Sequence, residues 1–154
     1  EQYEVRPVLQ SAMDYMRVRT SNKIEYQLLS DDALTQDGSE AKAMLCAPLF
    51  EWVVENLLKN ALDAMQGHGD IDVNISANEK TVTIDVSDTG KGIAKNNWKR
   101  IFEPGYTTKT RGWGLGLSLS RRIVEDYHHG KIVVAKSEVG VGTTFRITLK
   151  RVIE

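Results

Sequence analysis

The sequence has one cysteine and no long apolar run, and each shortage excludes a class of protein. Cys46 cannot form a disulfide within the chain, so a disulfide-stapled secreted domain is excluded and a reducing compartment, the cytoplasm by default, is expected. No stretch is apolar over the length that spans a bilayer, and no charged-then-apolar leader is present. Because the chain begins at Glu1 and not at Met, we expect a fragment of a longer protein, which could itself be anchored in the inner membrane.

An excess of charge of either sign is also missing. Twenty Lys and Arg residues face 21 Asp and Glu residues, which gives a formal net charge of -1. No overall attraction to nucleic acid or to an anionic membrane surface is therefore expected, and a phosphate site would have to be local. The 154 residues, 41% of them hydrophobic, can bury one sizeable core, so a single domain over residues 1–154 is predicted.

Hydrophobic periodicity predicts the main elements. Apolar residues at three-and-four spacing indicate amphipathic helices over residues 5–18 and 49–65, and Pro48 suits the first helical position of the second. Alternation of apolar and polar residues predicts strands over 23–30, 71–77, 82–86, 132–135 and 143–149, with a short strand over 43–47 and a helical turn within 96–102. The hairpin of residues 71–86 should deliver Asp88 to an edge of the sheet.

Residues 88–92 (DTGKG) follow the second strand of this hairpin and predict the floor of a nucleotide pocket. A carboxylate at the end of a buried strand is costly unless a group donates hydrogen bonds to it, and the amino group of adenine is such a donor. The glycines let the backbone turn sharply and approach a ligand. Taken alone, the motif is explained more often by a strand that ends in an Asp-Gly turn.

The helix over residues 49–65 carries Asn56, Asn60 and Asp63 within roughly 60° of one another, beside its apolar face. Amides at the margin of a core can line a pocket, and two asparagines one turn apart lower helix propensity. The alternative is an ordinary polar face, which is our interpretation of Glu55 and Lys59 as a solvated pair four residues apart.

Residues 91–113 show little periodicity, and so long a loop in a compact domain is often a functional lid. It ends in residues 112–116 (GWGLG), and a helix follows at once, whose free N–H groups and dipole favour phosphate. Lys109 and Arg111 stand before it and could face phosphate oxygens, or could be solvated surface cations. His128 and His129 close the helix and are predicted as polar groups at its C-terminus, because no second set of metal ligands is suitably spaced.

In this order the motifs resemble the catalytic and ATP-binding domain of sensor histidine kinases, a superfamily shared with DNA gyrase, the large heat-shock chaperones and the mismatch-repair ATPases. Residues 55–61 (ENLLKNA) are similar to its N box, 88–92 to the first glycine box, 101–109 (IFEPGYTTK) to the F box, 112–117 (GWGLGL) to the second glycine box and 140–145 (GVGTTF) to the closing glycine motif. The resemblance covers nearly the whole chain. It implies an α+β fold, a two-layer α/β sandwich with helices on one face of a mixed, mostly antiparallel sheet, and an ATP lid over about 91–114.

The resemblance also implies residue roles. Asp88 would accept from the adenine amino group, Asn60 would coordinate Mg²⁺, Asn56 would assist at the phosphate end, and Lys109 would contact the β- and γ-phosphates with the backbone of the second glycine box. Asn56 and Lys109 are the predicted catalytic residues. The predicted ATP-binding residues are Asn56, Asn60, Asp88, Gly90, Gly92, Ile93, Phe102, Thr107, Thr108, Lys109, Gly112, Gly114, Leu115, Gly116, Leu117 and Thr143.

One position separates kinases from hydrolases in this superfamily. The gyrase-like and chaperone-like ATPases have a water-activating glutamate four residues before the metal-binding asparagine, where this chain has Asn56, and Glu55 points about 100° away. The resemblance therefore implies a kinase domain that presents the γ-phosphate of ATP to a histidine on a dimerisation domain, expected upstream of Glu1, and that reaches a response regulator through the full-length protein. The alternative is a nucleotide-gated binding module or an ATPase of the same superfamily.

Three features qualify the resemblance. The histidines of this chain lack the acid and proline that follow a phospho-accepting histidine, so the isolated chain is not expected to phosphorylate itself, and no direct contact with nucleic acid or membrane is expected. Asp63 and Ala64 replace the basic and aromatic residues that many members carry there, which could weaken nucleotide affinity. Gly105 replaces a bulky F-box residue, which could loosen the lid.

Overall fold

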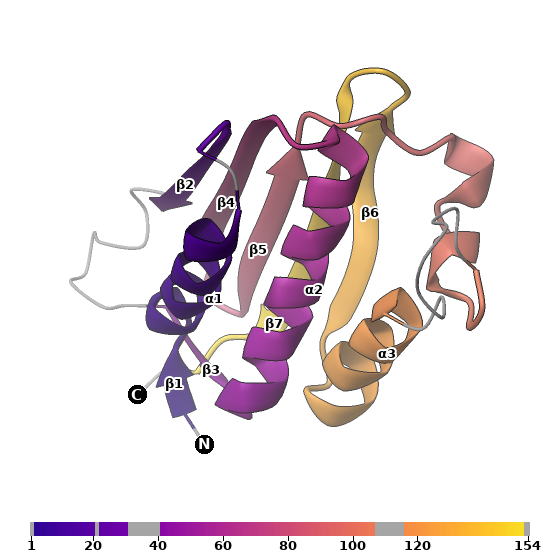
Figure 1. Cartoon of the computed structure of the whole chain (residues 1–154). Coiled ribbons are helices and arrows are strands. Elements are labelled where there is room, and N and C mark those ends of the chain that lie inside the picture. The colour runs from indigo at the N-terminus through magenta and orange to yellow at the C-terminus, as the bar shows by residue number, and fades with distance from the viewer. Residues whose placement is uncertain (1, 21, 31–40, 107–115, 153–154) are drawn as a thin grey trace.

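The computed structural model describes residues 2–20, 22–30, 41–106 and 116–152, which form a sheet covered on one face by helices (Figure 1). The sheet has the strand order β2-β4-β5-β7-β6. Its strands are β2 (Ile24–Ser30), β4 (Gly69–Ala77), β5 (Thr81–Asp88), β6 (Lys131–Glu138) and β7 (Gly142–Lys150). Only the pairing of β2 with β4 is parallel, and the other neighbours are antiparallel. The predicted fold class, a two-layer sandwich on a mixed, mostly antiparallel sheet, is confirmed.

The helical layer consists of α1 (Val5–Arg19), α2 (Ala47–Met65) and α3 (Gly116–Arg122), which lie side by side over the sheet (Figure 1). The last of these continues as one π-helical turn, η4 (Ile123–Tyr127), and two 3-10 turns, η2 (Lys95–Asn97) and η3 (Arg100–Phe102), precede it. A two-stranded ribbon of β1 (Gln2–Glu4) and β3 (Lys42–Met44) pairs the segments that lead into α1 and α2.

The core lies between the sheet and the helices α1 and α2, as the apolar spacing of these elements predicts. The buried side chains of α2 are Phe50, Val53, Val54, Leu57, Leu58, Ala61 and Met65. In β5, Val82, Ile84 and Val86 are buried, while the residues that alternate with them face away from the helices. On that open face the guanidinium of Arg146 donates two hydrogen bonds to Asp85, at 2.9 and 3.0 Å.

The predicted boundaries need four corrections. The strand expected over residues 43–47 ends at Met44, because α2 already begins at Ala47 and Pro48 is tolerated within its first turn. The helical turn expected within 96–102 is two separate 3-10 turns, and β1 was not predicted. Since β5 lies between β4 and β7, Asp88 ends the central strand and not an edge strand.

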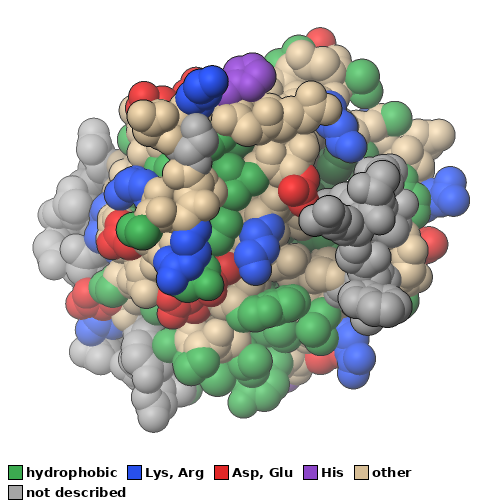
Figure 2. All heavy atoms as spheres, in the orientation of Figure 1, with side chains coloured by type: hydrophobic (Ala, Val, Ile, Leu, Met, Phe, Trp, Pro, Cys, Tyr) green, Lys and Arg blue, Asp and Glu red, His purple; other side chains and the backbone are tan. Residues whose placement is uncertain are grey.

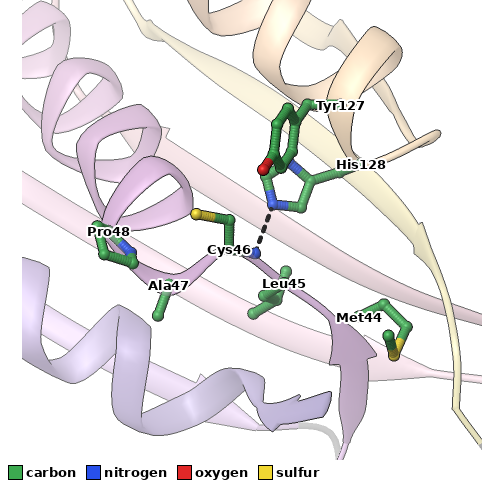
Figure 3. A pocket seen from close by; sticks show the side chains of 7 residues that line it. All are labelled: Met44, Leu45, Cys46, Ala47, Pro48, Tyr127 and His128. Carbon is green, nitrogen blue, oxygen red and sulfur yellow. Dashed lines mark hydrogen bonds between the residues drawn. The ribbon is translucent and has the colours of Figure 1, made fainter. Parts of the chain in front are cut away.

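His128 connects the end of the π-helical turn to the beginning of α2 (Figure 3). Its Nδ1 lies 2.9 Å from the carbonyl oxygen of Ile123, and its Nε2 accepts a hydrogen bond from the backbone N–H of Cys46 at 3.1 Å. The ring also packs edge-on against Phe50, with 5.7 Å between centroids. The contact with the carbonyl oxygen of Ile123 confirms the prediction that His128 is a polar group at the C-terminus of this helix. The hydrogen bond with Cys46 connects two segments that are 82 residues apart in the chain.

We expect His128→Phe to destabilise the domain by about 1–3 kcal/mol, because the phenyl ring keeps the packing on Phe50 but leaves the Cys46 N–H without its acceptor. Urea unfolding followed by circular dichroism measures the change. His68→Phe, in the exposed turn after α2, is the control and should have a far smaller effect. Equal midpoints for the two variants would contradict the proposed role of the ring.

Candidate nucleotide site

Asp88 stands at the C-terminal end of β5, where its carboxylate is held by two backbone groups. The N–H of Gly90 donates to Oδ1 at 2.9 Å, and the N–H of Thr143, its register partner on β7, donates to the same oxygen at 3.3 Å. Within the part of the chain that the structure describes, no group donates to Oδ2. Burial raises the pKa of Asp88 above its ordinary value of 3.8, and the two backbone hydrogen bonds oppose this effect only in part.

The glycine turn after Asp88, residues 89–92, packs between α2 and the turn that joins β6 to β7. A Cβ on Gly90 would lie 2.6 Å from the Cβ of Ala64 and 2.7 Å from its carbonyl carbon, so this position accepts only glycine at the observed spacing. The N–H of Lys91 donates to the carbonyl of Ala64 at 3.0 Å. On the other side, Gly92 has a φ of +77° and lies against the backbone of Glu138.

Ala64 and Gly105 are two of the positions that depart from the family pattern. Ala64 is half-buried and lies so close to the glycine turn that only glycine fits at position 90. Gly105 has a φ of +83° and open space around its Cα, which is a left-handed turn that favours glycine. The predicted effects of Ala64 and Gly105 on nucleotide affinity stay predictions.

Ser137 is a residue of this region that the sequence motifs did not indicate. Its hydroxyl accepts a hydrogen bond from the N–H of Ile93 at 2.7 Å and lies 2.7 Å from the hydroxyl of Thr143. It thereby links the start of the predicted lid to the strand pair that holds Asp88. The side chain of Thr143 is buried and engaged by Ser137, so its backbone, and not its hydroxyl, contacts Asp88. Only the strand register, which pairs Ser137 with Thr143, could have identified it.

Asn56 and Asn60 lie one turn apart on α2, and both are half-buried. The Nδ2 of Asn56 donates to the hydroxyl of Ser120 on α3 at 3.0 Å, and its Oδ1 lies against Gly116. Across the described ranges, no group of three or more His, Cys, Asp or Glu residues could hold a metal ion. A magnesium ion would therefore depend on amide and phosphate oxygens, which fit this hard cation, and Asn60 supplies such an oxygen.

Phe102 of the predicted F box is buried, with its ring perpendicular to that of Phe145 at 6.2 Å between centroids. Leu117 is half-buried and packs against the core. The remaining lid predictions, namely Thr107, Thr108, Lys109, Gly112, Gly114 and Leu115, lie outside the described residues, as does Arg111. Their roles stay predictions.

A pocket of about 450 Å³ lies at the opposite end of α2 and contains none of the predicted binding residues. It is lined by Met44, Leu45, Cys46, Ala47, Pro48, Tyr127 and His128 (Figure 3). Hydrophobic side chains also gather at the lower end of the helical face in Figure 2. Since Ala47 and Ala64 are separated by about 25 Å along the helix, this pocket is not part of the site around Asp88.

The model of the histidine kinase-, DNA gyrase B- and HSP90-like ATPase family matches residues 47–153. Sporulation kinase E of Bacillus subtilis is 37% identical over 97% of this chain, which spans 19% of that protein. Sensor histidine kinase ZraS of Escherichia coli K12 is 46% identical over 84% of the chain, which spans 26% of that protein. The nucleotide-free catalytic domain of histidine kinase ThkA is 24% identical and superposes with a TM-score of 0.84, covering 98% of this chain and 95% of that one.

The chain belongs to this family of ATPase-fold domains, and the predicted class, a histidine kinase catalytic domain, is confirmed. The family match covers α2 and all the boxes of the predicted site, while the solved domain shows that the likeness in fold extends over α1 and β2 as well. None of the helices in the described ranges is long and apolar enough to cross a bilayer.

The raised pKa of Asp88 predicts that its ionised form opposes folding. A carboxyl group with a folded-state pKa above its unfolded value supports stability at pH values below both, and this contribution is lost as the pH rises through the folded value. Asp88→Asn removes this titration but keeps an oxygen for the N–H groups of Gly90 and Thr143.

We therefore expect the melting temperature of Asp88→Asn, relative to the parent protein, to be higher at pH 7 than at pH 3.5, as measured by calorimetry. Other carboxyl groups titrate in both proteins and cancel in the difference. A difference in melting temperature that does not change with pH would disprove the claim that buried charge at Asp88 costs stability.

Proposed function

We propose that this chain binds Mg²⁺-ATP around Asp88 and presents the γ-phosphate to a histidine on another domain of the same protein. The observation that carries the proposal is the state of Asp88. Its Oδ1 is fixed by two backbone N–H groups, its Oδ2 keeps acceptor capacity, and burial makes its charge costly without a further donor. The exocyclic amino group of adenine is a donor that suits this position, as the resemblance to the family implies.

The phosphates would then extend from Asp88 toward the asparagines of α2 and the second glycine box. Asn60 would hold Mg²⁺ through its amide oxygen, and the ion would supply charge neutralisation at the β- and γ-phosphates. Lys109 and the backbone of residues 112–116 would contribute further phosphate contacts. In such a site the chain's own groups act by positioning and charge, and no side chain needs to form a bond to phosphorus.

A kinase function is favoured over hydrolysis by the residue at position 56. Asn56 donates its amide to Ser120, and an amide cannot remove a proton from water as a carboxylate can. Glu55, the neighbouring carboxylate, has a raised pKa because of burial and the nearby Glu51, and lies on a different side of α2. A nucleophile from elsewhere in the protein is therefore proposed.

The proposed partners lie partly in the rest of the protein, since the relatives are much longer than this chain. The chain spans about a fifth to a quarter of the two relatives described above, so a dimerisation domain with the phospho-accepting histidine belongs to the remainder of the protein in this proposal. One structural neighbour is histidine kinase ThkA in complex with response regulator protein TrrA. We propose a response regulator as the partner of the full-length protein. We also propose that this domain is located in the cytoplasm.

Calorimetric titration tests the nucleotide site. We expect Asp88→Asn to weaken Mg²⁺-ATP binding about 10- to 100-fold, because a hydrogen bond to a buried charged acceptor is lost. Asp85→Asn, on the same strand but on the open face with Arg146, is the matched control and should bind ATP as the parent does. Equal affinity of the parent and Asp88→Asn would eliminate Asp88 as the adenine acceptor.

Transfer of radiolabel from γ-labelled ATP tests the kinase. We expect no stable label on the isolated chain, since none of its histidines has the context of a phospho-acceptor, and label on the full-length protein. The label on the full-length protein should be acid-labile, as a phosphohistidine is. Stable labelling of the isolated chain would refute the claim that the phospho-acceptor lies outside it. Rapid phosphate release without any label on the full-length protein would refute the kinase proposal in favour of an ATPase.

A further inference from the structure

Ser120 is a buried serine on α3 that neither the motifs nor the predicted site includes. Its side chain is 0% exposed, in a layer whose other buried groups are mostly apolar. A buried hydroxyl costs free energy unless it is hydrogen-bonded. Its oxygen accepts the hydrogen bond from the Nδ2 of Asn56 at 3.0 Å, so α2 and α3 are joined at the residue that separates kinases from hydrolases in this family.

The side chain of Asn56 is held at two points of α3. Nδ2 donates to Ser120, and the whole amide lies against Gly116: a Cβ built there would be 2.7 Å from Oδ1 and 3.1 Å from Nδ2. Gly116 and Ser120 are four residues apart and therefore share one face of the helix. Because the hydroxyl of Ser120 accepts from Nδ2, the oxygen is the amide atom nearer to Gly116 in this arrangement.

We infer that Ser120 is a positioning residue for the proposed ATP site, because it orients the Asn56 amide with its oxygen toward the beginning of α3. This inference rests on the proposed function. An amide oxygen is a ligand for Mg²⁺ or for water bound to it, but it repels a bare phosphate oxygen. Ser120 should therefore matter for nucleotide binding with magnesium and matter little without it.

Calorimetry with ATP in Mg²⁺ and in EDTA tests this difference. Ser120→Ala should raise the Kd for Mg²⁺-ATP about 3- to 10-fold, as expected for one hydrogen bond, and change the Kd in EDTA by less than about twofold. Ser120→Cys, similar in size but a weaker acceptor, should be intermediate. The control is Ser11→Ala, which removes a serine hydrogen bond from the other side of α2, the 2.6 Å bond to Glu51, and should change neither Kd.

A double-mutant cycle separates positioning from general support of the fold. In the Asn56→Ala background, Ser120→Ala should change the Kd for Mg²⁺-ATP by less than about twofold, because the amide that it orients is gone. If the fold-changes of Asn56→Ala and Ser120→Ala multiply in the double variant, or if Ser120→Ala weakens binding equally in EDTA, then Ser120 acts only through the fold and the inference is wrong.

A spectroscopic readout decides the point without ATP. In ¹⁵N NMR spectra of the nucleotide-free domain, Ser120→Ala should shift the side-chain amide signals of Asn56, and Ser11→Ala should leave them in place. Unchanged Asn56 signals in Ser120→Ala would overturn the inference whether or not the domain binds ATP. Failure of the parent protein to bind Mg²⁺-ATP would instead refute the proposed function.

Discussion

The half-buried carboxylate of Asp88 and its two backbone donors constrain much of the surrounding structure. Its Oδ1 accepts from the glycine turn that follows it and from β7 beside it, so both segments must stay in register with β5. The same turn packs on Ala64 near the C-terminal end of α2, and the N–H of Ile93, just after the turn, donates to the hydroxyl of Ser137. These contacts lower the cost of the buried charge without removing it, as the raised pKa of Asp88 indicates.

The second organising element is α2, because it makes specific contacts with its neighbours at both of its ends and in its middle. Its C-terminal end meets the glycine turn at Ala64, its middle binds α3 through Asn56 and Ser120, and its N-terminal end meets His128 through the N–H of Cys46. Apolar burial holds the helix on the sheet, and is non-directional. The three polar contacts are directional, so they set the position of α2 along its axis and around it.

Much of this could be predicted from sequence. The periods of the apolar residues identified α1, α2 and the strands of the main sheet, since buried faces impose period 3.6 on helices and period 2 on strands. The motifs singled out Asp88, Asn56 and Asn60 by residue type and spacing, and the roles of these residues toward ATP stay predictions. The sequence patterns did not predict β1, because a strand of three residues is too short to show alternation. They did not indicate Ser137 or Ser120 either, because the contacts of these residues arise from strand register and helix packing.

The sequence by itself determined the class of protein: five motifs in one order and an asparagine at position 56 point to a histidine kinase catalytic domain. The tertiary structure decided how the site is held. Thr143 contributes its backbone and not its hydroxyl, Gly90 makes room for Ala64, and the ring of His128 accepts from the N–H of Cys46, 82 residues away in the chain, where α2 begins. Such contacts join segments distant in sequence, and their geometry depends on packing, which no local pattern of residues encodes.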